Sequence, residues 1–430
     1  MQDRWRYLLR YLRPDRPPPL PEMERLYVHP PRSSASEIVR NFQADPTGLQ
    51  KFLLVGARGG GKSTELREVA RRLADRAVIA SIDLDASGVT ATAVSAFDLL
   101  YLSGLALLRL IPDDQQDRWY KALIAAYGGD EKSLGRSAKD ALSGLVSFTD
   151  AAGKLASAIG MVAGVHVIAA GLGVANAGVR LLGRGDRLVV ENSPEGRRLQ
   201  DTCRAIASAT RAANPNRSLC VLVDGLEKMN GQANERFQQV FCSTRLLADA
   251  DWMVAIAAPP STLTATNSAT NLGYITVPVW GFAPEDAGVL EELLRRRFQI
   301  AGLDPDKDVD AGALARLVSQ SGGLPRHTIL MLRYAVESAL DTGAQRITGE
   351  HVEEGIRRVG EDLGLGLTEE DLQILARVHR RNQIPGGERA SRLFGDGRIL
   401  ARAPAPGRRL PGFVVHPVLV SELPMSDDDP

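Results

Sequence analysis

The chain has 430 residues, of which 24% are charged and 44% hydrophobic, and its formal net charge is zero. This length allows two or three domains with a large core, and the composition excludes a disordered or fibrous chain. A zero net charge gives no global field that favours nucleic acid, so any such site has to be a local basic patch.

Three cysteines, Cys203, Cys220 and Cys242, lack C-x-x-C spacing. An odd number without that spacing favours reduced thiols over a disulfide framework. The first 13 residues are basic but lack the apolar core and cleavage site of a signal peptide. We therefore expect a cytoplasmic protein.

The N-terminal stretch RWRYLLRYLR places Trp5, Leu8, Leu9 and Leu12 on one helical face and arginines on the other. Such a helix either docks on its own domain or lies on a membrane surface. Its length of about three turns favours docking. Prolines in residues 16–21 then predict a linker, and we assign residues 1–45 to this N-terminal region.

The stretch GARGGGKST, residues 56–64, fits the phosphate-loop (P-loop) pattern G-x-x-x-x-G-K-[ST], and it follows an apolar strand and precedes a helix-periodic segment at 65–75. Glycines let successive backbone N–H groups surround phosphates, and the helix N-terminus adds its positive end. In this pattern Lys62 reaches the β and γ phosphates and the Ser63 hydroxyl ligates magnesium. The residues expected to contact the nucleotide here are Gly56, Arg58, Gly59, Gly60, Gly61, Lys62, Ser63 and Thr64.

After a second predicted strand at 77–84 and helices at 91–110 and 113–127, the chain enters an Ala/Gly-rich insertion, about 134–190. Within it, residues 155–179 carry no acidic or basic side chain except a histidine, and by length they could span a membrane. A single crossing would place the P-loop and the downstream strands on opposite sides of a bilayer. We therefore favour a soluble insertion packed on its domain or a neighbouring subunit; the alternative is a span or a re-entrant pair of half-helices.

A helix from Ser193 to about Ala213 precedes a second nucleotide motif. Residues 219–224, LCVLVD, form an apolar strand that ends in an acid, a Walker B pattern in which Asp224 would hold magnesium through water opposite Ser63. Further strands at 252–257 and 274–279 complete an α/β domain over residues 46–283.

These motifs resemble the AAA+/STAND group of P-loop ATPases, near the branch that joins origin-recognition ATPases with signal-transducing STAND ATPases, in a bacterial form. The resemblance is carried by GARGGGKST, LCVLVDGLEK, MVAIAAPPS and two lid segments at 291–302 and 321–340. It implies a parallel P-loop sheet sandwiched by helices, a helical lid over residues 284–362, and ATP with magnesium as ligands.

The family's G-x-P turn, matched by Gly323, Pro325 and Arg326, implies that Pro325 packs by the adenine and that Arg326 reaches the γ-phosphate. An arginine finger for a neighbouring subunit could come from the triplet Arg295, Arg296 and Arg297, which could equally be a charged helix face.

The sequence departs from that family in two places. Gly225 stands where AAA+ enzymes have a glutamate, and Glu227 follows as in the STAND pattern D-G-x-D/E, which implies slow, regulated hydrolysis if Glu227 polarises the water. The arginine–glutamate box before the P-loop is replaced by YVHPP at residues 27–31. The expected catalytic residues are Lys62, Asp224, Glu227 and Arg326.

The C-terminal elements, helices at 368–381 and 388–394 and strands at 398–403 and 412–415, resemble a winged helix (363–425) before an acidic tail at 426–430. The stretch from Arg377 to Arg409 contains nine arginines and only two acidic residues, Glu388 and Asp396. This composition makes it a candidate nucleic-acid patch. The alternative is a protein-contact or autoinhibitory role.

We expect an ATP-binding, slowly hydrolysing conformational switch in a signalling or phage-defence assembly, either as a homo-oligomer or with a partner effector protein. Two alternatives remain open at this point. One is an ATP-regulated DNA-binding protein that uses the winged helix, and the other is a KAP-like membrane-associated ATPase that uses residues 155–179.

Overall fold

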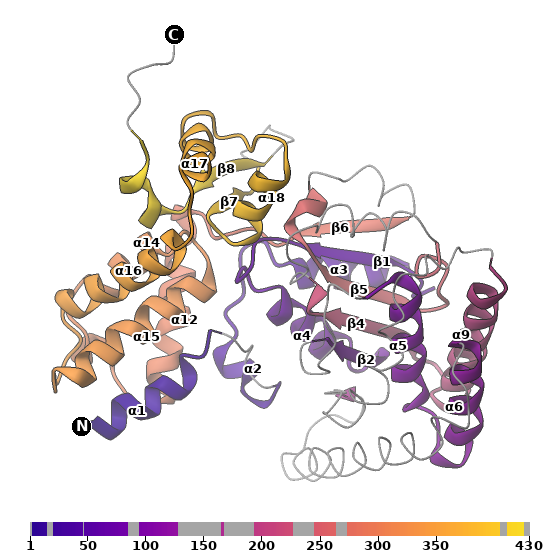
Figure 1. Ribbon diagram of the computed structural model, residues 1–430. Coiled ribbons are helices and arrows are strands. Elements are labelled where there is room, and N and C mark those ends of the chain that lie inside the picture. Colours follow the sequence, from indigo (N-terminus) through magenta and orange to yellow (C-terminus); the bar gives the residue numbers. More distant parts are fainter. Residues whose placement is uncertain are drawn as a thin grey trace. The chain divides into compact units, whose positions relative to one another are not determined.

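The structure of the protein is a computed structural model, and it describes residues 2–14, 20–45, 47–84, 94–127, 165–166, 193–226, 245–263, 273–404 and 411–424 (Figure 1). The chain forms two compact units. The first contains residues 1–34, 56–65 and 278–430, and the second contains residues 35–55 and 66–277. The P-loop, the lid and the C-terminal elements thus belong to one unit and the sheet to the other. The domain boundaries drawn from the sequence stay predictions.

A parallel sheet forms the second unit, with strand order β3-β2-β4-β5-β1-β6. The pairs from β3 to β1 are all parallel, and β1, β4 and β5 are almost fully buried, as strands covered on both faces should be. The strands are β1 (Lys51–Val55), β2 (Ala77–Asp83), β3 (Val165–His166), β4 (Ser218–Asp224), β5 (Met253–Ala258) and β6 (Tyr274–Pro278). This arrangement confirms the predicted α/β fold class.

Helices pack with these strands into one apolar core, which includes side chains from α5, α6 and α9 (Figure 1). The helices are α3 (Ser34–Ala44), α4 (Lys62–Leu73), α5 (Ala96–Leu108), α6 (Asp113–Tyr127) and α9 (Pro194–Ala213), and a 3-10 turn, η4, spans Pro260–Leu263. α5 begins later than predicted because Ser95 caps it: the Asp98 N–H donates to Ser95 Oγ over 3.2 Å, and the Ser95 N–H donates to Asp98 Oδ2 over 2.7 Å.

The first unit is mainly helical. Its lid comprises η5 (Pro284–Asp286), α12 (Ala287–Ile300), α13 (Pro305–Asp308), α14 (Ala313–Gln320), α15 (Pro325–Asp341) and α16 (Gly349–Gly364), and it is preceded in the chain by α1 (Gln2–Tyr11) and α2 (Leu20–Leu26). α1 packs on α15 and α12, with Trp5, Leu8 and Leu12 buried and Trp5 Nε1 donating to Ala344 O over 3.2 Å. The N-terminal helix therefore docks on its own chain, and the membrane-surface interpretation is not supported.

The C-terminal segment, residues 368–424, contains the predicted order of helix, helix and hairpin. It consists of α17 (Glu369–Arg381), α18 (Glu388–Gly395), the antiparallel pair β7 (Ile399–Arg402) and β8 (Gly412–Val415), and the 3-10 helix η6 (Pro417–Glu422). Thr368 and Asp371 form a capping box at the start of α17, which fixes where this helix begins.

Several sequence predictions lie outside the described residues. Residues 155–179 are outside except for β3, as are Glu227, Arg408, Arg409 and the tail at 426–430. Among the residues that are described, no helix is both long and apolar enough to cross a membrane.

Candidate functional site

The P-loop backbone turns sharply between β1 and α4. Gly59 and Gly61 have positive φ angles of 85° and 103°, which only glycine adopts without strain. The Gly60 N–H donates to Ala57 O over 3.1 Å, and the Glu65 N–H donates to Gly61 O over 2.9 Å. The helix thus starts at Lys62, directly at the end of the turn and earlier than the predicted residue 65. The N-terminus of a helix carries the positive end of its dipole and is the kind of place that binds phosphate oxygens.

Lys62 is the cation of this turn, and only 4% of it is exposed. Its Nζ donates to Gly56 O over 2.9 Å and to Ala57 O over 3.1 Å. The ammonium is therefore held over the start of the loop by its own backbone carbonyls. Gly56 must be a glycine because a Cβ there would clash with Val279 O.

The predicted lid turn lies against the P-loop within the same unit. α15 begins at Pro325 as the G-x-P pattern predicts, and the N–H of Arg326, in the first turn of this helix, donates to Gly59 O over 3.2 Å. A Cβ on Gly59 would lie 2.5 Å from Arg326 Cβ. Arg326 therefore packs on the loop that should hold the phosphates, whereas its contact with a γ-phosphate stays a prediction.

The N-terminal region supplies a contact that the sequence did not predict. Tyr27 OH donates to Glu65 Oε1 over 2.8 Å, and Ser33 Oγ donates to Glu65 Oε2 over 3.0 Å. Glu65 is buried and lies three residues after Lys62. The segment that replaces the arginine–glutamate box is thus tied to the first turn of the P-loop helix.

Two acids meet at the carboxyl edge of the sheet. Asp83 and Asp224 end β2 and β4 and are direct neighbours in the parallel register. The Gly225 N–H donates to Asp224 Oδ1 over 3.0 Å, and Gly225 has a φ of 96°. A glutamate at 225 would be strained in that conformation, which gives the departure from the AAA+ pattern a physical reason. Asp83 was missed, although it ends an apolar run as Asp224 does.

Arg67 of α4 belongs to this acidic edge. Burial lowers the pKa of its guanidinium, and the charges of Asp224 and Asp83 act in the opposite direction. The carboxylates are therefore close enough to stabilise the buried cation. The sequence offered no signal for this placement beyond the position of Arg67 on the P-loop helix.

The arginine triplet of α12 is engaged within the chain. Arg295 pairs with Asp306 at 2.9 Å, and Arg296 pairs with Glu292 at 2.8 Å. Arg297 is buried and donates to Leu293 O over 2.8 Å and to Tyr11 O over 3.2 Å. These contacts give each side chain a partner within the chain. Arg295 and Arg296 fit the interpretation as a charged helix face, whereas Arg297 is buried, and an arginine finger from this triplet stays a prediction.

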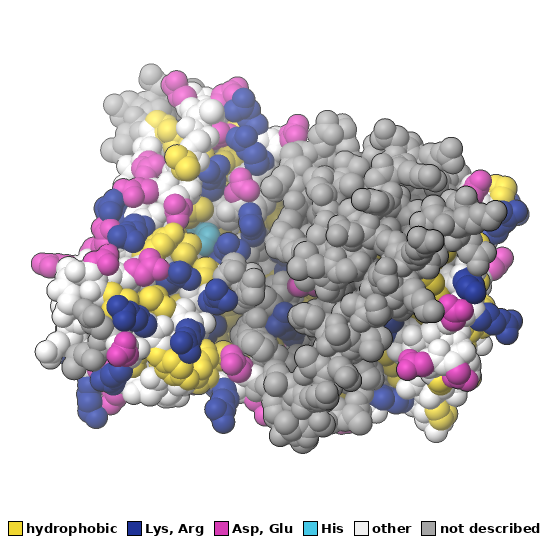
Figure 2. Space-filling view, turned by 60° about the horizontal axis from the view of Figure 1, so that its bottom comes forward, with side chains coloured by type: hydrophobic (Ala, Val, Ile, Leu, Met, Phe, Trp, Pro, Cys, Tyr) yellow, Lys and Arg dark blue, Asp and Glu magenta, His cyan; other side chains and the backbone are white. Residues whose placement is uncertain are grey.

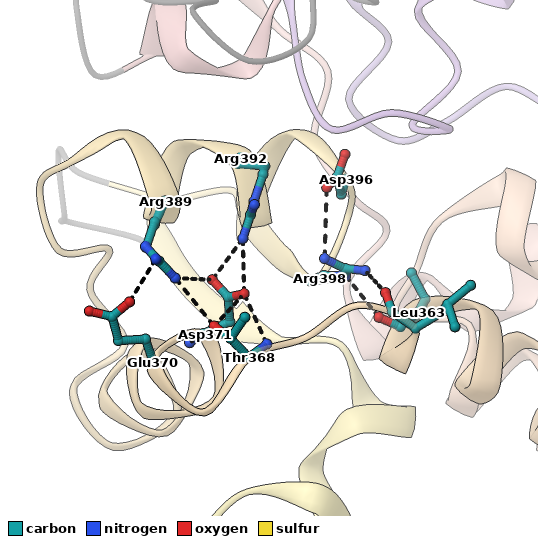
Figure 3. A network of polar contacts seen from close by, with 9 residues as sticks. Leu363, Thr368, Glu370, Asp371, Arg389, Arg392, Asp396 and Arg398 are labelled. Atoms are coloured by element: carbon teal, nitrogen blue, oxygen red, sulfur yellow. Dashed lines mark hydrogen bonds and ion pairs between the residues drawn. The ribbon is translucent and has the colours of Figure 1, made fainter.

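Several arginines of the predicted nucleic-acid patch likewise have partners. Arg392 donates to both oxygens of Asp371 over 2.9 Å, and Arg389 pairs with Glu370 at 2.7 Å; Figure 3 shows this network. Burial alone would raise the pKa of Asp371, but bonds from the Thr368 backbone and hydroxyl and from Arg392 hold it below its ordinary value.

Arg398 donates to Leu363 O and Leu365 O over 2.8 and 2.7 Å (Figure 3), and Arg402 donates to Phe282 O. Arg377, Arg380 and Arg381 of α17 are exposed. Figure 2 shows basic and acidic side chains intermingled on the described surface of the view. Because Arg389 and Arg392 pair with acids, the patch is less basic than its composition suggests.

Comparisons with known proteins give fold-level likeness only. No family model and no curated protein matches the chain. Among solved structures it is similar to the Aeropyrum pernix ORC2 protein in its ADPNP–ADP complexes, at 13% identity over 96% of this chain and 94% of that one, with a TM-score of 0.43. The Aeropyrum pernix ORC1 protein in complex with DNA gives 12% identity, 96% and 93% coverage, and a TM-score of 0.42.

The Thermotoga maritima RuvB Holliday junction branch migration motor gives 14% identity, covers 89% of each chain, and has a TM-score of 0.37. Identities and TM-scores this low carry no functional conclusion. The function has to be argued from the residues of the site.

Proposed function

We propose that this protein binds ATP with magnesium at the P-loop and hydrolyses it slowly to ADP and phosphate, as a nucleotide-dependent conformational switch. The observation that carries the proposal is the loop itself. Gly59 and Gly61 take the backbone conformation that a phosphate cradle needs, and Lys62 is held beside them at the start of a helix.

The site residues have distinct roles in this proposal. Lys62 and the backbone N–H groups of residues 59–64 bind the phosphates. The hydroxyl of Ser63 and the carboxylates of Asp224 and Asp83 are oxygen donors, the ligand type that magnesium prefers. Magnesium, when bound, neutralises phosphate charge. Glu227 orients the attacking water and accepts its proton, and Arg326 approaches the γ-phosphate from the lid.

A switch fits the site better than a fast motor. Gly225 replaces the glutamate that would directly follow Asp224 in AAA+ enzymes, so the base is displaced along the chain. The lid turn touches the P-loop through Arg326 and Gly59, which gives nucleotide a direct route to the lid. We assign the switch to a signalling or phage-defence assembly in the cytoplasm, as a homo-oligomer or with an effector protein; the buried free thiols of Cys203 and Cys220 support that location.

A DNA-binding regulator is the weaker candidate. Four arginines of the C-terminal segment, Arg389, Arg392, Arg398 and Arg402, already donate to groups of this chain. Phosphate contacts would have to come from other basic residues, such as the exposed Arg377 and Arg381 of α17, or from residues outside the described ranges. Binding of this kind would fall steeply with salt.

The deciding experiment compares the wild type with Lys62→Ala, Glu227→Gln and the control Lys121→Ala, an exposed lysine of α6. A fluorescent ATP analogue gives the Kd, phosphate release gives turnover, and gel filtration gives the assembly size. Lys62→Ala should weaken ATP binding about ten- to hundredfold, since a charged hydrogen-bond donor is lost. Glu227→Gln should keep ATP bound and slow its turnover about a hundredfold or more. Equal binding and turnover in all four proteins would reject the site.

A further inference from the structure

Two buried imidazoles join the lid to the C-terminal segment. His327 Nδ1 lies 2.9 Å from His416 Nε2, and the ring centroids are 4.9 Å apart. His327 is 7% exposed and His416 is fully buried. His327 directly follows Arg326 in α15, and His416 directly follows β8, so one side-chain contact connects the predicted G-x-P turn to the hairpin.

The hydrogen-bond partners of His416 determine which of its ring nitrogens carries the proton. Its Nε2 also lies 3.2 Å from Ser321 O, which can only accept, so we assign the proton of His416 to Nε2. His327 Nδ1 then accepts from the same N–H. This tautomer leaves His416 Nδ1 bare, in agreement with that buried atom having no hydrogen-bond partner.

Both rings are neutral at the pH of a cell. Burial lowers the pKa of His327 to about 4, and the neighbouring charge of Arg326 acts in the same direction. Burial also lowers the pKa of His416, with further contributions from His327 and Arg402. The contact is therefore a hydrogen bond between uncharged groups in a buried site, and breaking it removes this partner from the buried His327 Nδ1.

Glycines let the two parts approach this closely. A Cβ on Gly322 would lie 2.9 Å from His416 Cδ2 and 2.5 Å from Leu400 Cδ1. A Cβ on Gly397 would lie 3.4 Å from His327 Cε1. Both turns therefore need a glycine where they contact the other part: Gly322 in the lid turn and Gly397 in the turn before β7.

The same two parts also touch the P-loop. The Arg58 N–H donates to Gly395 O at the end of α18 over 3.4 Å, while the Arg326 N–H donates to Gly59 O over 3.2 Å. The His327–His416 bond closes a ring of three contacts among the P-loop, the lid turn and the C-terminal segment. A shift of any one part strains the other two contacts.

We propose that His416 is a positioning residue for the nucleotide site: through His327 it holds the C-terminal segment on the lid turn, so that ATP binding loosens the segment and release of the segment tightens ATP binding. This regulation rests on the proposed ATP site. The stem of the Arg326 side chain packs on Gly59 of the P-loop, and the Arg326 N–H donates to Gly59 O. A nucleotide bound in the loop therefore acts directly on the first turn of α15, which includes His327.

The coupling is reciprocal, since two sites linked by one equilibrium change each other's affinity by the same factor. We expect His416→Leu to lower the Kd for a fluorescent ATP analogue about fivefold or more. The matched control is His379→Leu, an exposed histidine of α17 in the same segment, which should leave the Kd unchanged. His416→Gln keeps an amide that can donate to Ser321 O and should give an intermediate Kd.

A double-mutant cycle of His327→Leu and His416→Leu tests whether the two rings act together. The double variant should bind ATP no more tightly than either single variant, because the shared bond is already lost. Amide hydrogen exchange of residues 399–402 and 412–415 in the full chain gives a measurement without substitution. Exchange should rise on adding ATP to the wild type and should not rise in Lys62→Ala.

The outcomes separate the two proposals. If the wild type binds no ATP, the proposed function and the coupling both fail. If ATP binds through Lys62 but exchange in the hairpin does not change, or if His416→Gln and His416→Leu bind ATP as the wild type does, the coupling alone is overturned. If His416→Leu does not fold, the coupling is still tested by hydrogen exchange of the wild type and by the Kd of His416→Gln for the ATP analogue.

Discussion

Lys62 of the P-loop and Arg392 of the C-terminal segment are both basic side chains in stretches that the sequence marks as binding sites, yet they differ in what surrounds them. Lys62 is buried and donates to backbone carbonyls of its own loop, in a turn where Gly59 and Gly61 have positive φ angles. Arg392 donates to Asp371, a carboxylate from the neighbouring helix. A motif with fixed spacing specifies backbone geometry, whereas a run of arginines specifies only composition and leaves their acceptors open.

The largest expected effect comes from Gly59→Ala, which tests whether backbone geometry defines the P-loop. A side chain at a φ of 85° costs about 1–2 kcal/mol, and the clash with Arg326 adds about as much, so the free energy of unfolding should fall by about 3 kcal/mol. The Kd for ATP should rise about tenfold or more. The control is Gly288→Ala in α12, where nothing lies within 4 Å of the added Cβ. Equal ATP binding by Gly59→Ala would show that the loop does not depend on this conformation.

Acidification should lower the stability of the contact between the lid and the C-terminal segment, through the buried imidazoles of His327 and His416. Both have a lower pKa in the folded chain than the ordinary 6.5, so the unfolded chain binds protons first as the pH falls. For His327 this contribution to stability is complete above about pH 6.5 and is lost as the pH falls toward about 4, which amounts to about 2 kcal/mol between pH 7 and 5. His416 changes the stability in the same direction.

Denaturant titrations at pH 7 and 5 measure this loss. The double variant His327→Leu/His416→Leu should show a shallower fall in stability with pH, while His379→Leu should follow the wild type. An unchanged slope in the double variant would contradict the assigned neutral pair.

The smallest of the three effects is expected for Asp371→Asn, which tests whether the arginines of the C-terminal segment are held by this acid. The cap on α17 remains, but the charged bonds to Arg392 and Arg389 are weakened, so stability should fall by about 1–2 kcal/mol. Glu370→Gln, at the exposed partner of Arg389, is the control and should change stability by less than about 1 kcal/mol.

The same pair of variants also tests the nucleic-acid alternative. Asp371→Asn should increase salt-sensitive binding to duplex DNA if the released arginines can reach phosphates. A stability loss without any change in DNA binding would favour the structural role of this network.

The parts of the fold that the sequence predicted correctly are those specified by local pattern. Continuous apolar runs predicted β1, β2, β4 and β5, and the G-x-P turn predicted the start of α15 at Pro325. The boundaries of α4 and α5 were missed by a few residues, because the P-loop turn and the Ser95 capping box set them.

The contacts between distant residues could not be predicted in this way. Tyr27 meets Glu65 and His327 meets His416 only because separate elements pack, and neither pair has a characteristic spacing. Asp83 was a near miss, since it ends an apolar strand as Asp224 does but lacks a following motif. The acceptors of Arg389 and Arg392 depend on how α18 packs against α17, which composition does not encode.

The left-handed turn at Gly225 has a consequence for how this chain could evolve. A glutamate placed directly after Asp224 would need that turn to be rebuilt, because a residue with a Cβ is strained at a φ of 96°. A single Gly225→Glu substitution would therefore strain this turn. If the chain hydrolyses ATP as proposed, selection for faster turnover would act more readily on positions further along the loop than on residue 225.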